Sequence, residues 1–181
     1  MKQIFVIFSL LLAASLHAHT GVMNSDSNGL SLLNRIDYSP SLTTSGQPTE
    51  EELALIASAG FDRVIFLAFT NHPKAVSHED DIVRDQGLQF IHIPVEWDSP
   101  SLSDFAAFAA VMQTFGSGRT LVHCEVNFRA SVFGFLYQVL SGGADVDEAM
   151  SLMQSIWVPN DKWEAFIVRV MNDNGVDYPT L

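Results

Sequence analysis

The sequence predicts an α/β protein whose mostly parallel central sheet, of about four to five strands, is flanked by helices on both faces. Two observations lead to this fold class. Short apolar segments alternate along the chain with segments of helical spacing, and capping residues or glycines fall at the ends of the helical segments. The 181 residues, of which 48% are hydrophobic, suffice for one domain with a sizeable core.

The predicted strands are short. We expect them at residues 36–38, 42–45, 63–68, 90–93 and 119–123. Because helical segments separate most of these strands, neighbouring strands are expected to run parallel, with helices covering the sheet.

The predicted helices are marked by their ends. Thr49 and the three glutamates after it form a capping box that opens a helix ending at Gly60. A charged helix is expected at residues 77–86, before Gly87. A helix opened by Ser101 is expected to end at Gly116. Three further segments have helical spacing: residues 129–140, 145–156 and 160–172.

The N-terminus has the pattern of a secretory signal at residues 1–18. Lys2 precedes an apolar run at residues 4–14, and a small residue, Ala18, stands before the expected cleavage site. The run is too short for a stable membrane anchor. We therefore expect a secreted, periplasmic protein with a flexible lead-in at residues 19–34 and a single domain at residues 35–181.

The segment from His123 to Ser131 contains the main candidate catalytic residues. It holds Cys124, which is the only cysteine of the chain, and Arg129. A helix N-terminus and a nearby cation lower the pKa of a thiol and so favour the nucleophilic thiolate. Amide groups at a helix start, together with a guanidinium, bind an anion such as phosphate or sulfate. A strand, a loop and a helix are predicted here in the order that such a site needs.

The same segment resembles the His-Cys-x5-Arg-Ser/Thr signature of the tyrosine and dual-specificity phosphatase superfamily. Three further segments extend the resemblance to the small bacterial phosphatase-like family related to the beta-lactamase-hydrolase-associated phosphatases: 45–48 (Ser-Gly-Gln-Pro), 60–65 (Gly-Phe-Asp-Arg-Val-Ile) and 92–95 (His-Ile-Pro-Val). The resemblance, over residues 35–140, implies hydrolysis of a phosphate monoester through a phosphocysteine, without metal or cofactor.

The resemblance also implies roles for single residues. Cys124 would attack phosphorus, and the loop residues Glu125, Val126, Asn127 and Phe128 would bind phosphate together with Arg129. His123 would support the thiol by hydrogen bonding, and Ser131 would help the thiolate to leave.

The spacing departs from this family, because four residues separate Cys124 from Arg129 instead of five. If the loop keeps its length, Asn127 takes the place of the family glycine, which it can do because asparagine tolerates left-handed backbone. Arg129 then approaches the anion from another side. If the loop is one residue shorter, it resembles that of rhodanese-type sulfurtransferases. A third alternative is an inactive anion-binding module, which the unusual carboxylate of Glu125 favours.

A general acid is expected in the turn after the strand at residues 90–93. The resemblance indicates Asp98 as the first choice and Glu96 as the second, although an Asp before Ser-Pro is also a common turn former. Glu125 is a third candidate. Trp97 either lines a substrate pocket or packs under the loop. Because ligands bind at the carboxyl ends of parallel strands, we expect residues 68–72, 96–98 and 124–129 to converge.

The net charge of the chain limits the classes of molecule that it can bind. Nine basic residues stand against 21 acidic ones, which gives a net charge of −12. Nucleic acid is therefore excluded as a partner, whereas a small phosphorylated molecule or a phosphoresidue is compatible. His72 and His78 do not have the spacing of a metal site.

Overall fold

The computed structural model describes residues 30–114, 117–176 and 178. The predicted signal at residues 1–18 and the lead-in up to residue 29 lie outside the described residues. None of the helices in these ranges is long and apolar enough to cross a membrane.

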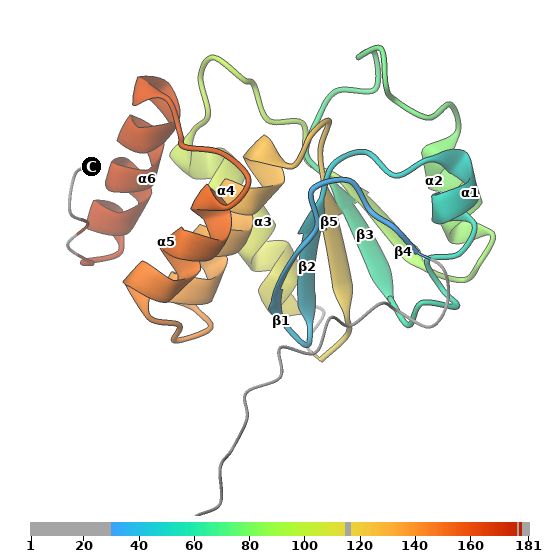
Figure 1. Cartoon of the computed structure of the whole chain (residues 1–181), viewed down its shortest axis with the longest axis horizontal. Coiled ribbons are helices and arrows are strands. Elements are labelled where there is room, and N and C mark those ends of the chain that lie inside the picture. Colours follow the sequence, from blue (N-terminus) through green and yellow to red (C-terminus); the bar gives the residue numbers. More distant parts are fainter. Residues whose placement is uncertain (1–29, 115–116, 177, 179–181) are drawn as a thin grey trace, which may run out of the picture.

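A five-stranded sheet forms the centre of the molecule, with the order β1-β2-β5-β3-β4 (Figure 1). Its strands are β1 (Ile36–Ser39), β2 (Leu42–Ser45), β3 (Arg63–Phe66), β4 (Gln89–His92) and β5 (Thr120–His123). Only the edge hairpin of β1 and β2 is antiparallel, and β5 pairs in parallel with both β2 and β3. The predicted, mostly parallel α/β sheet is confirmed.

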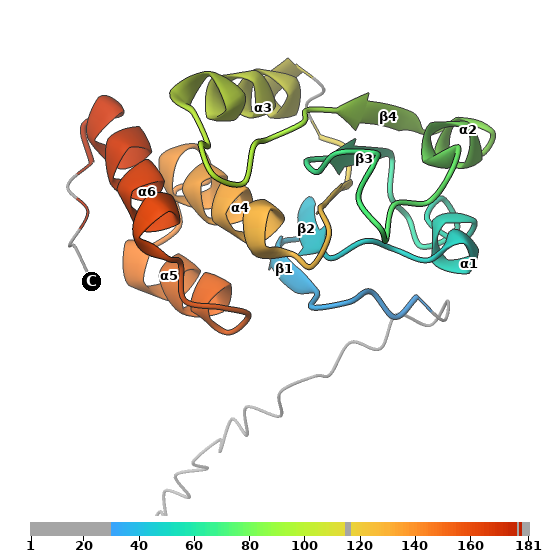
Figure 2. The same cartoon turned by 90° about the horizontal axis from the view of Figure 1, so that it is seen from above.

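Helices cover both faces of the sheet, as predicted (Figure 2). One face carries α1 (Glu50–Leu53) and α2 (Glu79–Arg84). The other face carries α3 (Leu102–Thr114) and α4 (Phe128–Leu140), with α5 (Val146–Gln154) and α6 (Asp161–Asp173) packed beyond them. Two apolar cores lie on the two faces, the larger of them on the side of α3 and α4.

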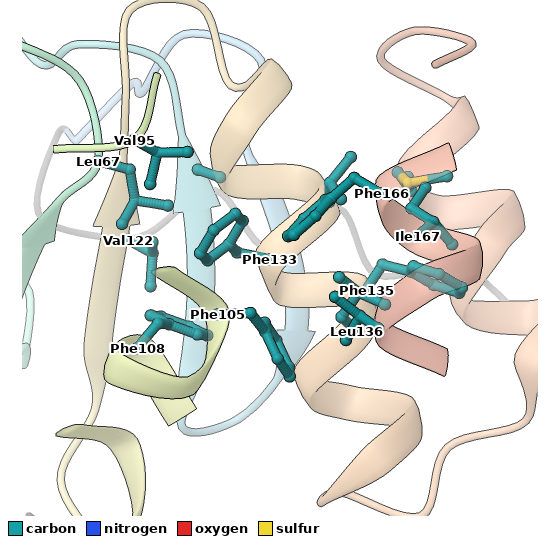
Figure 3. Close-up of a cluster of buried hydrophobic side chains, with 14 of the residues drawn as sticks. Leu67, Val95, Phe105, Phe108, Val122, Phe133, Phe135, Leu136, Phe166 and Ile167 are labelled. Atoms are coloured by element: carbon teal, nitrogen blue, oxygen red, sulfur yellow. The ribbon is translucent and has the colours of Figure 1, made fainter. Parts of the chain in front are cut away.

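The larger core fixes α4, the helix that follows the cysteine loop. Figure 3 shows Phe133 of α4 between Val122 of β5 and Phe166 of α6. The rings of Phe133 and Phe166 lie 5.7 Å apart, and all three side chains are fully buried. Burial of aromatic surface on this scale holds the start of α4 in a fixed position relative to the end of β5.

Two helices are shorter than the sequence predicts. The capping box at Thr49 is present, but α1 ends at Leu53, and turns with three-residue spacing lead on to Gly60. α2 begins only at Glu79, because His78 before it has a left-handed backbone with φ of 56°. Gly60 and Gly87 end these segments with positive φ, as the glycine rule predicts.

Candidate functional site

The cysteine loop joins the central strand β5 to α4, at the upper edge of the sheet in Figure 1. Asn127 caps the helix with φ of 72°, which confirms the predicted left-handed backbone at this position. Its side-chain amide donates to the carbonyl oxygen of Asn34. The turn therefore forms with an asparagine where the resembled family has glycine.

Two carbonyl groups of the loop accept hydrogen bonds from residues outside it. The carbonyl oxygen of Glu125 accepts a hydrogen bond from the backbone amide of Gln47 at 3.1 Å. The carbonyl oxygen of Val126 accepts one from Asn34 Nδ2 at 3.0 Å. Within the described ranges, the amide groups of Glu125, Val126 and Phe128 donate to no acceptor. Free amides at a helix start, with their carbonyls held elsewhere, are the groups that bind an anion.

Cys124 lies beneath this loop and is fully buried. Its amide donates to the carbonyl oxygen of Ser45 at 3.3 Å, and its side chain belongs to the larger apolar core. It is a free cysteine. In this conformation the residue has no exposed surface, so the sulfur is covered from solvent.

Arg129 is half-buried on the first turn of α4. Its Nε donates to the carbonyl oxygen of Val95 at 3.0 Å, and its guanidinium carbon lies 5.3 Å from the ring centre of Trp97. These contacts fix the stem of the side chain at the loop that follows β4. They also leave both terminal nitrogens of the guanidinium without a hydrogen-bond partner among the described residues, so they are available to an anion.

A hollow of about 370 Å³ opens beside Arg129. Residues of all three segments that were expected to converge line this hollow. They are Ala68, Phe69, Asn71 and His72 after β3, Glu96 after β4, and Glu125 and Arg129 after β5. One guanidinium thus faces two carboxylates. Burial lowers the pKa of His72, an effect that Glu125 opposes and Arg129 reinforces, so the neutral imidazole is favoured there.

The two candidate acids after β4 point to different places. Glu96 lines the hollow with Arg129, whereas Asp98 lines a separate depression with Lys162 and Arg169. Asp98 Oδ1 lies 2.6 Å from Lys162 Nζ, and the Asp98 side chain is 76% exposed. The structure therefore brings Glu96, and not Asp98, together with Arg129.

Ser131 and Trp97 are occupied with other partners. The Ser131 hydroxyl donates to the carbonyl oxygen of Phe128 at 3.0 Å and accepts from Trp157 Nε1 at 3.1 Å. Trp97 packs against Phe128, Trp157 and Trp163, with ring centres 5.3 to 6.2 Å apart. Trp97 thus takes the second of its two predicted roles, packing under the loop, and it also supports the guanidinium of Arg129.

A buried pair of titratable side chains, which the sequence did not indicate, lies where α2 meets the end of β5. His123 Nε2 lies 2.6 Å from Glu79 Oε1, and the two side chains are 0% and 5% exposed. Gln47 Nε2 donates to the other carboxylate oxygen at 2.9 Å. Burial alone would raise the pKa of Glu79, but the charge and hydrogen bond of His123 and the hydrogen bond of Gln47 lower it below its ordinary value.

No sequence pattern could have found this pair. Glu79 belongs to the acidic run of residues 79–81 at the start of α2, which is typical of a solvated helix end. Only the tertiary fold brings Glu79 to the strand that carries His123. Among the described residues, no group of three or more His, Cys, Asp or Glu side chains could hold a metal ion.

Comparison with known proteins gives the family. No family model matches the chain. A beta-lactamase hydrolase-like protein of Xylella fastidiosa is 31% identical over 121 residues, which are 65% of this chain but only 28% of the relative's length. Among solved structures, the core catalytic domain of the PP-IP phosphatase SIW14 from S. cerevisiae has a TM-score of 0.61 at 12% identity, over 78% of this chain and 93% of that one, and so shares the fold.

A second solved structure is more similar in sequence. It is that of a phosphatase-like protein of the DUF442 type from Shewanella putrefaciens CN-32, which is 31% identical, covers 83% of this chain and 99% of its own, and has a TM-score of 0.75. The resemblance of the cysteine loop, the shared fold and this coverage agree with one another, and the chain belongs to the DUF442 family of phosphatase-like proteins.

Proposed function

We propose that this chain is a cysteine-dependent phosphatase that hydrolyses a phosphate monoester of a small molecule or a phosphoresidue. The observation that carries the proposal is the loop of residues 124–128. The amides of Glu125, Val126 and Phe128 donate to no acceptor among the described residues, and with the helix start at Phe128 they would bind the phosphate next to Cys124.

The residues near the loop supply the steps. The Cys124 thiolate attacks phosphorus, and a sulfur–phosphorus bond forms as the bond to the leaving oxygen breaks. Arg129 and the loop amides stabilise the equatorial oxygens. A carboxylic acid protonates the leaving oxygen, and its carboxylate then takes a proton from the water that attacks phosphorus, which releases the Cys124 thiolate and phosphate.

We assign the acid role to Glu96. Its position in the hollow beside Arg129 supports this assignment, whereas Asp98 is held at the surface by Lys162. A general acid must come within hydrogen-bond reach of the leaving oxygen, and this favours a side chain that already shares a cavity with the phosphate-binding arginine.

The full burial of Cys124 favours a second candidate function. In an inactive module, the loop would bind phosphate or sulfate through its amides and Arg129, and the sulfur would stay packed in the core. Glu125, whose carboxylate shares the hollow with Arg129, would oppose a second negative charge at the thiolate.

One experiment separates these functions. Two quantities are measured for the wild type and for Cys124→Ser. One is the rate of hydrolysis of an aryl phosphate, and the other is the binding of inorganic phosphate, which is measured by calorimetry. A phosphatase loses turnover on substitution and keeps phosphate binding. An inactive module binds phosphate in both forms and hydrolyses nothing.

Arg129→Met should weaken phosphate binding in either case, and Arg84→Met serves as its control, because Arg84 pairs with Asp80 on α2, away from the loop. Absence of phosphate binding in the wild type would contradict both functions. A single added sulfur on Cys124 after incubation with thiosulfate would instead support the sulfurtransferase alternative.

A further inference from the structure

We infer that Asn34 is a positioning residue for the phosphate-binding loop, and that residues 30–34 therefore belong to the proposed site. The inference rests on the proposed function, because the position of the loop matters for function only if its amides bind an anion. In this role Asn34 acts on the loop and does not touch the anion.

Residues 30–34, which end the predicted lead-in, are anchored on the domain. Leu30 and Leu32 are buried in the smaller apolar core, with 6% and 7% of their surface exposed. The carbonyl oxygen of Leu33 accepts a hydrogen bond from the Gly46 amide at 2.7 Å. Because these neighbours are anchored, the backbone of Asn34 has a fixed place beside the loop that follows β5.

Two hydrogen bonds of opposite direction join Asn34 to the loop. Asn34 Nδ2 donates to the carbonyl oxygen of Val126 at 3.0 Å, and the Asn34 carbonyl oxygen accepts from Asn127 Nδ2. The two partners are consecutive residues, so Asn34 holds the peptide group between them. Because a peptide group is planar, it can rotate only as a unit, and rotation of this one would break the hydrogen bond from Asn34 Nδ2.

The peptide group that Asn34 holds lies between two free amides of the loop. The amides of Val126 and Phe128 donate to no acceptor among the described residues. The direction of the Phe128 amide depends on the backbone of Asn127, which is left-handed with φ of 72°. Left-handed backbone is unfavourable for a residue with a Cβ, so the contact with Asn34 stabilises the conformation in which these amides are free for an anion.

A glycine beside the loop allows residues 30–34 to approach it. Gly46 forms an isolated antiparallel bridge with Val126, and its amide donates to the carbonyl oxygen of Leu33. A Cβ at position 46 would lie only 2.8 Å from Leu33 Cδ2. The segment of residues 30–34 therefore lies close to the loop because residue 46 has no side chain between them.

The test is calorimetry of the binding of inorganic phosphate to the full chain. Asn34→Gly removes the side-chain donor and keeps the backbone unstrained, because the φ of 51° at this position suits glycine. It should weaken phosphate binding by about threefold to tenfold, the equivalent of one hydrogen bond. Asn34→Asp, which has an acceptor in place of the donor, should weaken binding at least as much. Wild-type affinity in Asn34→Gly would overturn the inference.

The matched control is Asn174→Gly. Asn174 Nδ2 donates to the carbonyl oxygen of Val170 at 2.8 Å at the C-terminal end of α6, so the substitution removes a hydrogen bond of the same kind. It should leave the affinity for phosphate unchanged, and urea denaturation of both glycine variants measures how much stability each loses. An equal loss of affinity in the two variants would mean that stability, and not the position of the loop, sets the affinity, and it would overturn the inference.

A measurement on the wild type covers the case in which the Asn34 variants do not fold. Phosphate should shift the NMR resonances of the Asn34 side-chain amide with the dissociation constant that calorimetry gives, because the anion binds the amides on either side of the peptide group that Asn34 holds. The side-chain amide of Asn174 should not shift. An Asn34 resonance that phosphate leaves unchanged would overturn the inference.

The outcomes for the proposed function are separate. If the wild type binds phosphate but hydrolyses no ester, the proposed phosphatase fails, and the affinity of Asn34→Gly still decides the role of Asn34. If Asn34→Gly binds phosphate and hydrolyses the ester as well as the wild type does, the proposed function stands and this inference fails. A wild type that binds no phosphate would overturn both.

Discussion

Asn127 shows how one residue permits the turn between β5 and α4. Its φ of 72° lies in the left-handed region, and its side chain donates to the carbonyl oxygen of Asn34. Left-handed backbone costs a residue with a Cβ about 1 to 2 kcal/mol. A side chain with no polar group cannot offset this cost with a hydrogen bond to Asn34.

We therefore predict that Asn127→Ala lowers the free energy of unfolding by about 2 to 3 kcal/mol, which adds the backbone cost to one lost hydrogen bond. Asn127→Gly should cost about 1 kcal/mol, because glycine accepts this backbone freely. Urea denaturation of the three proteins measures the difference. Equal losses for alanine and glycine would show that the hydrogen bond, and not the backbone, determines the cost.

The two carboxylates after β4 should differ in their effect on hydrolysis. Glu96→Gln should lower kcat for an aryl phosphate by about 10²-fold to 10⁴-fold, the usual contribution of a general acid. Asp98→Asn should leave kcat within about twofold, because it removes only an exposed ion pair with Lys162.

The loss should also depend on the leaving group. A phenol that leaves easily needs less protonation, so the effect of Glu96→Gln should shrink for such a substrate and grow for an alkyl phosphate. If Asp98→Asn shows that pattern instead, the acid is Asp98, and the segment after β4 must move when substrate binds.

Glu79 gives the fold a dependence on pH. Its folded pKa lies below the ordinary value of 4.5, so the unfolded chain binds more protons there as the pH falls. The stability from this group is complete above about pH 4.5, and it is lost as the pH falls from that value through the folded pKa.

We expect the free energy of unfolding of the wild type to fall in this range more steeply than that of Glu79→Gln, so that the two curves approach each other in acid. Denaturant unfolding over a pH series measures both. The variant Glu148→Gln, whose side chain is exposed on α5, should follow the wild type. Parallel curves for wild type and Glu79→Gln would contradict the low folded pKa.

At the scale of the elements, α4 must lie close to the edge hairpin to place the cysteine loop. Gly134 makes this approach possible, because a Cβ at this position would lie 2.6 Å from Tyr38 Cε2 and 2.8 Å from Thr44 Cγ2. Tyr38 itself donates to the carbonyl oxygen of Ser131 at 2.8 Å, which ties β1 to the first turns of the helix.

Gly134→Ala should therefore destabilise the protein by about 1 to 3 kcal/mol, the usual cost of overpacking, although alanine is the better helix former. In a Tyr38→Ala background the same substitution should cost less, since the nearest ring is gone and only the contact with Thr44 Cγ2 remains. Thermal unfolding of the four proteins of this cycle measures the coupling. A stabilising Gly134→Ala would show that helix propensity outweighs the contact with Tyr38.

The elements themselves were largely predictable from the sequence. The strand at Leu42–Ser45 has its predicted bounds, and β5 and α4 begin within one residue of their predicted starts. These positions follow from the spacing of apolar residues and from the order of the segments along the chain. The predicted C-terminal ends of α1 and α2, and the start of α2, were wrong, since local sequence signals do not show how far tertiary contacts let a helix extend.

The site was predictable only in part. The convergence of three loops follows from sheet topology, and the left-handed Asn127 follows from residue chemistry. The burial of Cys124 and the pairing of Glu79 with His123 depend on packing between segments far apart in sequence, which spacing does not encode.

At the scale of the whole molecule, the net negative charge repels the proposed substrate, which is also negative. A net charge of −12 surrounds a hollow that holds one guanidinium and two carboxylates, so a phosphate dianion must approach against a repulsive field. Salt screens this field over roughly 30 Å at low ionic strength and about 8 Å at physiological ionic strength. The short contacts with Arg129 and the loop amides are screened much less.

We predict that kcat/KM for an aryl phosphate rises when the ionic strength increases from about 10 mM to about 150 mM, because screening removes more of the long-range repulsion than of the local attraction. Potassium chloride and choline chloride should give the same rise, which excludes a specific cation effect. An aryl phosphate that carries an ammonium group should show a weaker rise, since its net charge is smaller. A steady fall of kcat/KM with salt would mean that the field at the hollow is attractive, and that Arg129 and the amides outweigh the acidic surface at every distance.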